Sequence, residues 1–518
     1  MDANEVIMDV AATGSGLGIL DWLVIAGYLF GMIFIGWFFS KEAKTAEGYL
    51  LGGRQMKSAW VGLSLFATLL SAISYLMVPG EVIQNGPAFM LGKIAAYPIV
   101  VLIVGFFLIP VIMKLKITSA YEMLETRLGL GVRMLGSVFF LLLRLMWMAA
   151  IVYTTSAKVL IPIFGLSESV SIYFCFLITL ITIAYTSMGG LKATVYTDVV
   201  QSFVLFGGTF LTIGIIAFKL GGIGNCIPSE RPAHWPEFQW GFGSAPGART
   251  FMAALISTVV WFVSTNGSDQ TAIQRYLSTQ DVKTARRTLT YAMAASGFAG
   301  ILLTIVGLCL LSFYQTKPEL LGMGAGFTTG ADKVFPLYIT SQLPAGLSGL
   351  VLSGLLAAAM SSLSSGLNSS CSVVMVDFIG RFRGDKKDSI NPVKMAKLIT
   401  VCIGIVVVLF SVVVGMVKGN LLDMAFKICN LLTAPLFGLF FMAIFVRRAT
   451  GAGTLIGAAA GVITVFVISF WEDLFLGPTG LKGISILWAM PVCLLVQIVT
   501  GVLASLVVGT SGPPLDRD

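Results

Sequence analysis

Hydroxyl side chains gather in one stretch of the sequence that is otherwise apolar, residues 345–378. Ser361, Ser362 and Ser365 recur at helical spacings of three and four residues, so one face of a helix would present them, with Ser364 beside them. Hydroxyl and carbonyl oxygens are hard ligands that suit Na⁺ better than zinc or copper. Serines also let membrane helices pack closely, so the run by itself leaves a sodium site and a packing surface both open.

Two other apolar stretches are interrupted by polar residues together with glycine or proline. The first contains Ser71 and Ser74 followed by Pro79-Gly80, and the second ends in the polar residues 264–270. Paired interruptions of this kind point to the binding site of a secondary transporter. The physical reason is that unwound backbone frees carbonyl groups, which a membrane tolerates only around a cavity. Two ordinary kinked helices are the alternative interpretation.

Three ionisable residues lie in or near apolar stretches and need a reason to be there. Lys93 and Arg144 lie a turn or more inside their stretches, where a charged group normally faces a cavity or a partner. Both are therefore candidates for contact with a substrate. Asp198 lies near the start of another stretch, where a carboxylate could complete a cation site or cap a helix N-terminus.

These residues must be positioned by helices that cross a membrane. Hydrophobic residues make up 57% of the 518 residues and charged residues only 11%, against roughly a quarter charged in soluble proteins. Because a bilayer core needs about 20 apolar residues per helix, the sequence predicts an all-α integral membrane protein with about 13 transmembrane helices.

The basic residues predict how the chain is oriented. If the N-terminus lies outside, the predicted inner loops carry 22 of the 33 Lys and Arg residues and the outer segments carry only 7. Basic residues accumulate on the cytoplasmic side of a membrane. We therefore expect a multi-pass protein of the cell membrane, with residues 1–17 outside and a cytoplasmic tail at 509–518.

Other classes of function find little support in the sequence. The one histidine, His234, falls in a polar loop, and the seven cysteines show no paired C-x-x-C spacing. The glycine-rich segment 14–18 lacks the preceding strand of a nucleotide-binding fingerprint. We expect neither an enzyme nor a nucleic-acid-binding protein. A passive channel or a solute sensor remains an alternative to a transporter.

Four motifs together resemble the sodium/solute symporter family, which includes the sodium/glucose, sodium/proline and bacterial sialic acid transporters. They are Phe66–Ser74, Tyr185–Gln201, Asp269–Tyr276 and Ser361–Ser370. The resemblance implies a LeuT-type inverted repeat of five plus five helices. It would divide the chain into an extra N-terminal helix (18–40), a first repeat (58–218), a second repeat (249–446) and two C-terminal helices (451–508).

The resemblance also implies where the coupling ions bind. The principal Na⁺ of the family is held by carbonyls of the broken helix and by hydroxyls of the later one, which here correspond to Ala67, Leu70, Ala358, Ser361 and Ser362. Members with a second Na⁺ add a carboxylate and further hydroxyls, which correspond to Asp198, Ser364 and Ser365. Because Ser364 is present where single-sodium relatives lack a hydroxyl, we expect two Na⁺ per solute.

The substrate pocket of the family lies beside the break. It corresponds to Ser71, Ser74, Phe89 and Lys93, with Arg144 about one turn nearer the cytoplasm than the arginine of sialic acid transporters. Basic groups and hydroxyls favour a small anionic solute, such as a monocarboxylate or an acidic sugar, over a neutral sugar, amino acid or vitamin. The resemblance places gates at Phe89 outside and at Thr265 and Asn266 inside, in a transporter that functions as a monomer.

Overall fold

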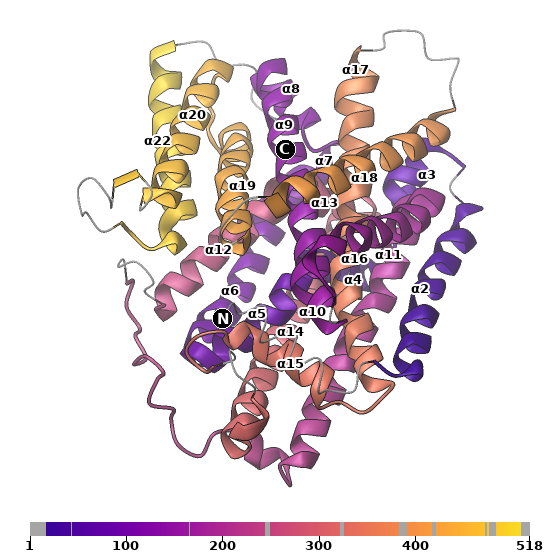
Figure 1. Ribbon diagram of the computed structural model, residues 1–518. Coiled ribbons are helices and arrows are strands. Elements are labelled where there is room, and N and C mark those ends of the chain that lie inside the picture. Colours follow the sequence, from indigo (N-terminus) through magenta and orange to yellow (C-terminus); the bar gives the residue numbers. More distant parts are fainter. Residues whose placement is uncertain are drawn as a thin grey trace.

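The computed structural model consists of helices and connecting segments throughout the residues that it describes (Figure 1). These residues are 17–42, 44–115, 117–164, 166–243, 249–321, 326–382, 391–416, 421–471, 474–475 and 483–508. Most of the predicted outer N-terminus (1–17) and the whole predicted tail (509–518) lie outside them. The all-α class predicted from composition is confirmed.

Ten helices of the described residues are long and apolar enough to cross a membrane, or eleven if one bent pair counts as a span. The bent pair is α4 (Ser58–Leu69) with α5 (Ala72–Asn85), which meet at 67°. The ten are Ile19–Ser40 (α2), Ala88–Lys114 (α6 to α7), Leu130–Ala157 (α9 into η3), Ser171–Lys219 (α11), Phe251–Ser268 (α12), Val282–Thr316 (α14), Leu347–Ile379 (α16 into η8), Pro392–Gly415 (α18), Gly451–Ser469 (α20) and Ile486–Val508 (α22).

Helix α11 is too long for a single crossing. Its 49 residues would extend about 74 Å at 1.5 Å per residue, more than twice a bilayer core of about 30 Å. At Gly190 the backbone leaves the helical region (φ 60°, ψ −148°), and a Cβ there would lie 2.4 Å from the carbonyl oxygen of Tyr49. Only glycine fits this bend. The two spans predicted on either side of residue 190 correspond to the two halves of α11, while the total of thirteen spans stays a prediction.

Helix α16 (Leu347–Val373) forms the centre of the bundle. All of its residues from Val351 through Val373 are buried, and it packs against α11, α2, α9 and α4. Its N-terminus is fixed by Asp21 of α2, whose carboxylate accepts hydrogen bonds of 2.7 Å from the N–H groups of Gly346 and Gly349. A capping carboxylate of this kind contributes about 0.5–2 kcal/mol.

The last two helices, α20 and α22, form a pair at one side of the bundle, next to α19 (Leu421–Phe445) (Figure 1). Glycines allow this close approach, since a Cβ on Gly457 would lie 2.6 Å from the carbonyl oxygen of Gln497. The pair lies apart from the broken helix and from α16. The residues predicted to bind ions and substrate all lie among the earlier helices.

Candidate functional site

The break between α4 and α5 exposes backbone carbonyl groups inside the bundle. Leu70 and Ser71 have extended backbone angles. No further helical turn therefore follows to donate N–H hydrogen bonds to the last carbonyl oxygens of α4. Ser71 begins α5 by accepting a hydrogen bond from the backbone N–H of Ser74 at 3.3 Å. The interruption predicted from the sequence is therefore a true helix break, not a kink, but it lies at Leu70 and Ser71, whereas Pro79-Gly80 lies inside α5.

Hydroxyls of α16 meet these free carbonyls. Ser361 Oγ donates to the carbonyl oxygens of Ala67 at 2.9 Å and Ala358 at 3.2 Å. Ser362 Oγ donates to the carbonyl oxygen of Thr68 at 3.0 Å. The structure thus brings together four of the five residues predicted for the principal sodium, and the fifth, Leu70, lies in the break itself. The space next to them is too small for a water molecule and is lined by Phe66, Ala67, Gln201, Ser202, Leu205, Ala357, Ala358 and Ser361.

Thr68 was not predicted as part of this set. Its carbonyl meets Ser362, and its own hydroxyl lies 2.7 Å from Ser365 Oγ. Thr68 therefore connects the two predicted ion sites. Its place in the last turn of α4, where carbonyls lose their helical partners, is a signal that the sequence already contained.

The residues predicted for a second sodium also gather in one place. Asp198 of α11 is fully buried, and its carboxylate accepts hydrogen bonds from Ser64 Oγ at 2.6 Å, Ser365 Oγ at 3.3 Å and Ser364 Oγ at 3.5 Å. It lies inside the helix, eight residues after the bend at Gly190. The alternative that Asp198 caps a helix at the membrane interface is therefore wrong.

Arg275 completes this cluster, and the sequence analysis misplaced it. It was counted among the basic residues of the inner loops, but its side chain is 0% exposed and pairs with Asp198 at 3.1 Å. The guanidinium also donates to Ser64 Oγ at 3.0 Å, to the carbonyl oxygen of Thr271 at 2.8 Å, and to Ser365. A buried carboxylate requires such compensation, so Arg275 supplies positive charge at the predicted second sodium site.

Arg275 belongs to a short polar helix, α13 (Gln270–Leu277), which follows the second break at Asp269. All eight residues of α13 are buried. Gln270 accepts from the N–H of Ala120 at 2.7 Å and donates to the carbonyl oxygen of Thr118 at 2.8 Å. Two further bonds join α13 to α16, Gln270–Ser372 (3.3 Å) and Thr271–Ser369 (2.9 Å). The Gln274 amide donates to the carbonyl oxygen of Leu50 in α3 (Ala46–Leu51) at 2.6 Å.

Arg144 and the predicted inner gate lie beside this second break. Arg144 forms an ion pair with Asp269, and both side chains are almost completely buried. Asp269 also accepts from the N–H of Thr271 at 2.8 Å and so caps α13. Asn266 Oδ1 accepts from the hydroxyl of Tyr276 at 2.7 Å. The carbonyl oxygen of Thr265, the other predicted gate residue, accepts from the N–H of Asp269 at 3.1 Å, which ends α12.

A second charged group lies around Phe89 on α6 (Ala88–Ile103). Lys93 Nζ and Arg249 Cζ each lie 5.8 Å from the centre of the Phe89 ring. Arg249 forms an ion pair with Glu81 of α5, which also accepts from Asn85 Nδ2 at 3.1 Å. We call Glu81, Phe89, Lys93 and Arg249 the outer cluster. Sequence reasoning found Phe89 and Lys93 but missed Glu81 and Arg249.

Close packing of α6 on α12 brings Arg249 into the outer cluster. A Cβ on Gly92 would lie 2.6 Å from the carbonyl oxygen of Phe251, two residues after Arg249. The two helices therefore touch where α12 begins. The remaining predicted substrate residues, Ser71 and Ser74, lie at the start of α5 with their hydroxyl oxygens 3.3 Å apart.

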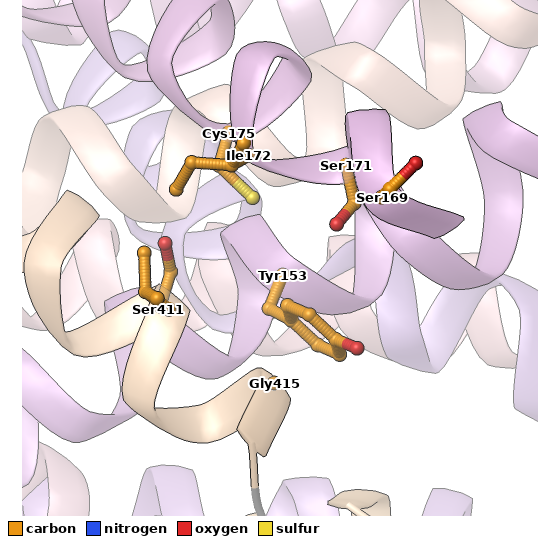
Figure 2. Close-up of a pocket in the computed structure, with 8 residues that line it drawn as sticks. Tyr153, Ser169, Ser171, Ile172, Cys175, Ser411 and Gly415 are labelled. Atoms are coloured by element: carbon orange, nitrogen blue, oxygen red, sulfur yellow. The ribbon is translucent and has the colours of Figure 1, made fainter. Parts of the chain in front are cut away.

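A cavity lies elsewhere in the bundle (Figure 2). It has a volume of about 440 Å³ and lies between the end of α9, the start of α11 and α18. It is lined by Tyr153, Ser169, Ser171, Ile172, Cys175, Ser411, Val412 and Gly415. None of the residues predicted for ions, substrate or gates lines it, so it carries no part of the site.

Comparison with known proteins gives one consistent result. The family profile described as "Sodium:solute symporter family" matches residues 49–461. The sodium/sialic acid symporter SiaT of Proteus mirabilis is 33% identical over 476 residues, which is 90% of this chain and 94% of that protein. The human sodium-coupled monocarboxylate transporter 1 is 29% identical, with 89% of this chain and 74% of that protein covered.

Solved structures agree with these relatives. The outward-open, substrate-bound structure of a Na⁺-coupled sialic acid symporter has a TM-score of 0.83 and 29% sequence identity, and covers 96% of this chain and 99% of its own. The transporter Mhp1 of the nucleobase-cation-symport-1 family has a TM-score of 0.58 at 12% identity, with coverage of 89% and 94%, so it shares the fold alone. The LeuT-type fold predicted from the motifs is confirmed.

Proposed function

The chain belongs to the sodium:solute symporter family, and on that basis we propose that it imports a small anionic organic solute, with two Na⁺ per solute, by alternating access. The solute class is a monocarboxylate or an acidic sugar. Sodium-coupled symport follows from the family. The solute, the number of ions and the residues that bind them are proposals. They are supported by the geometry of the residues around Asp198 and of the outer cluster.

The principal Na⁺ is held between the broken end of α4 and the hydroxyl face of α16. Ala67, Ala358, Ser361 and Ser362 already converge there through direct hydrogen bonds, and Leu70 adds a carbonyl from the break. A bound ion would replace these hydrogen bonds by shared oxygen ligands. Sodium then favours the conformation in which α4 and α16 lie together, by its difference in affinity between the two states.

The second Na⁺ binds at Asp198 with Ser364 and Ser365. The support for this site is a fully buried carboxylate surrounded by hydroxyls. Each positive charge that moves inward gains about 2.3 kcal/mol per 100 mV of membrane potential, so a second ion adds to the driving force for an anionic solute. In this arrangement the ion shares Asp198 with Arg275.

The observation that carries the anionic solute is the outer cluster. It holds two cationic groups against one carboxylate, and Lys93 forms no ion pair with any described residue. Cationic groups beside an aromatic ring suit a solute that carries a carboxylate and an apolar face. Ser71 and Ser74, at the start of α5, would bind hydroxyl or carbonyl groups of the same solute. We infer that Phe89 closes the outer side and that Thr265 and Asn266 lie along inward release.

The remaining features of the proposal concern its setting. The protein spans the cell membrane with its N-terminus outside and its C-terminus cytoplasmic, and it functions as a monomer. The first repeat (58–218) and the second (249–446) contain the broken helices α4–α5 and α12–α13 at corresponding positions. Arg144, which pairs with Asp269, reaches the solute only if that ion pair opens.

Transport by liposomes containing the purified protein tests the proposal. We expect a Na⁺ gradient to drive uptake of acidic solutes, with little uptake when K⁺ replaces Na⁺. A preceding thermal-shift screen of solutes in Na⁺ and in K⁺ would identify the substrate by its stabilising effect. Equal accumulation without Na⁺ would contradict symport and favour a passive channel. Stabilisation without any uptake would favour a solute sensor.

Lys93→Gln tests the solute class. Loss of a charge-assisted contact of about 1.5–3 kcal/mol should raise the apparent substrate constant for acids by about tenfold or more. Equal loss for neutral solutes would contradict pairing of Lys93 with a carboxylate. It would favour the alternative of a neutral sugar, amino acid or vitamin.

Asp198→Ala tests the second ion. The sodium Hill coefficient of transport should fall toward one, because one of two coupled ions loses its carboxylate. Ser364→Ala provides a second variant, since Ser364 contacts Asp198 but makes no contact with Arg275, and it should lower the coefficient in the same direction. A coefficient that stays above one in both variants would refute the assignment.

A further inference from the structure

Asn368 is a buried amide for which the described residues supply no partner. Its side chain lies on α16 and is 1% exposed, and neither Nδ2 nor Oδ1 forms a hydrogen bond. An amide can offer two donors and an acceptor with two lone pairs. Burying it unpaired is unfavourable, so the position requires a function that this conformation does not satisfy.

The helical geometry of α16 shows which way Asn368 faces. At about 100° per residue, Asn368 lies within about 20° of Ser361, and Ser365 and Ser372 lie on the same face. The neighbouring directions are occupied by known contacts. Ser364 faces Asp198 of α11, and Ser369 faces Thr271 of α13. Asn368 therefore points toward the seam between α11 and α13, two helices that both pack against α16 (Figure 1). One and two turns earlier on the same face of α16, Ser365 and Ser361 contact α4.

Oxygen groups follow this seam in steps of about one helical turn. From Ser365 to Asn368 the rise is about 4.5 Å, and from Asn368 to Ser372 it is about 6 Å. Ser365 belongs to the group of Ser64, Asp198, Arg275, Ser364 and Ser365, which we call the Asp198 cluster. Ser372 accepts a hydrogen bond from the side-chain amide of Gln270 in α13. Beyond Ser372, Asp377 accepts from Ser119 at 2.5 Å near the inner end of the bundle. Asn368 fills the gap between the predicted ion site and these inner groups.

We propose that Asn368 Oδ1 is a transient ligand for Na⁺ on its way from the Asp198 cluster to the cytoplasm. The inference rests on the proposed second sodium site. It adds a transient Na⁺-binding position one helical turn beyond that site, which we call the release station. An amide oxygen is a hard, neutral ligand that suits a monovalent cation without retaining it. In this structure α13 covers the seam, so the station operates when α13 separates from Ser369 and Ser372.

Asn368→Leu tests the station, and Ser370→Ala is its matched control. Ser370 is also fully buried with an unpartnered hydroxyl, but it lies on the opposite side of α16. In liposomes, Asn368→Leu should slow ²²Na⁺ release to the inner face by about tenfold or more, while the Na⁺ concentration for half-maximal thermal stabilisation stays within about twofold. Ser370→Ala should change neither. Equal release rates in the two variants would overturn the proposal.

A carboxylate at the same position tests the idea in the opposite direction. Asn368→Asp should retain Na⁺ and raise the affinity measured by thermal shift, because a charge replaces a neutral oxygen. Crystals soaked in Tl⁺, a heavy monovalent cation, should show an anomalous peak beside residue 368 in this variant. A peak only at the Asp198 cluster would overturn the station. Loss of Na⁺-driven uptake by the unsubstituted protein would instead refute the proposed function, so the two failures are distinguishable.

Discussion

The inner helix α13 and the outer cluster hold their polar groups in opposite ways. Every residue of α13 is buried, and its polar side chains bind α4, α11, α16 and the segment before α8 (Glu122–Leu128). In the outer cluster a single ion pair joins Arg249, which is 41% exposed, to Glu81. A solvent-exposed ion pair contributes about 0–1 kcal/mol, whereas a buried network loses far more when one member is removed.

In the proposed orientation, with α13 on the inner side of the membrane, this difference indicates which side of the transporter is easier to open. The outer side requires the exchange of one weak ion pair, and an acidic solute can offer its own carboxylate in place of Glu81. The inner side requires α13 to leave several partners together. One of those partners is Asp198, so the proposed second sodium and the inner closure depend on the same carboxylate. A sodium ion that neutralises Asp198 would weaken the ion pair between Asp198 and Arg275.

The largest effect should come from breaking the inner network at Arg275. Arg275→Ala leaves the buried carboxylate of Asp198 without its cation, and such a change costs about 3–5 kcal/mol. We expect a large fall in thermal stability in K⁺ buffer. The fall should be smaller in Na⁺ buffer, because a bound ion replaces the missing positive charge. Differential scanning fluorimetry in the two salts measures both values.

Two variants control this experiment. Arg287→Ala removes an exposed arginine of α14 and should change stability by less than about 0.5 kcal/mol. Arg275→Ala combined with Asp198→Asn removes both charges and should recover part of the loss. If the loss of stability in the double variant equals the sum of the losses in the two single variants, the pairing of these two residues does not account for the effect.

A smaller effect is expected at Gln270, which holds α13 by hydrogen bonds and no charge. Gln270→Leu removes its bonds to Thr118, Ala120 and Ser372, worth about 1 kcal/mol each. Local opening of α13 should then become about 150-fold more frequent. Hydrogen–deuterium exchange of the α13 amides measures this opening.

The outer side offers a matched glutamine. Gln84→Leu removes one exposed hydrogen bond, from Gln84 Nε2 to the carbonyl oxygen of Thr328, and should leave the exchange of α13 unchanged. If both glutamine variants accelerate exchange equally, α13 is not held more firmly than the outer region. The contrast between the two sides would then have no basis in hydrogen bonding.

The same contrast shows how far the sequence could predict this molecule. Apolar length and interruptions predicted membrane helices and two broken ones, around residues 66–80 and 264–270, because both signals are local. The structure has the breaks at Leu70 and Asp269. The hydroxyl face of α16 followed from helical spacing. Arg275 could not be placed in this way, since α13 is as polar as a loop. Its burial depends on Asp198 and Ser64, which are 77 and 211 residues away along the chain.

Glu81 and Arg249 were missed for a related reason. Glu81 lies in α5, and Arg249 lies at the end of a long outer segment. Nothing in either local pattern connects them with Phe89. They meet only because Gly92 lets α6 approach the start of α12. Contacts between distant segments, and hence the full membership of the outer cluster, come from packing.

The smallest effect should come from the outer ion pair, where its direction is more informative than its size. Glu81→Gln frees Arg249 for an acidic solute, so the apparent substrate constant should fall by about twofold to fivefold. Arg249→Gln should raise it by a similar factor, since an exposed pair is worth at most about 1 kcal/mol. Initial rates of Na⁺-driven uptake at varied solute concentration measure both constants.

Opposite shifts in these two variants are what distinguish an exchangeable ion pair from a structural one, because loss of a structural pair would impair both variants alike. Lys333→Gln, which removes an exposed basic residue outside the cluster, should leave the constant unchanged and so exclude a general effect of net charge. Both shifts should shrink when choline chloride raises the ionic strength, since exposed charges are screened within about 8–10 Å. Shifts in the same direction would show that Glu81 holds α5 in place and does not compete with the solute for Arg249.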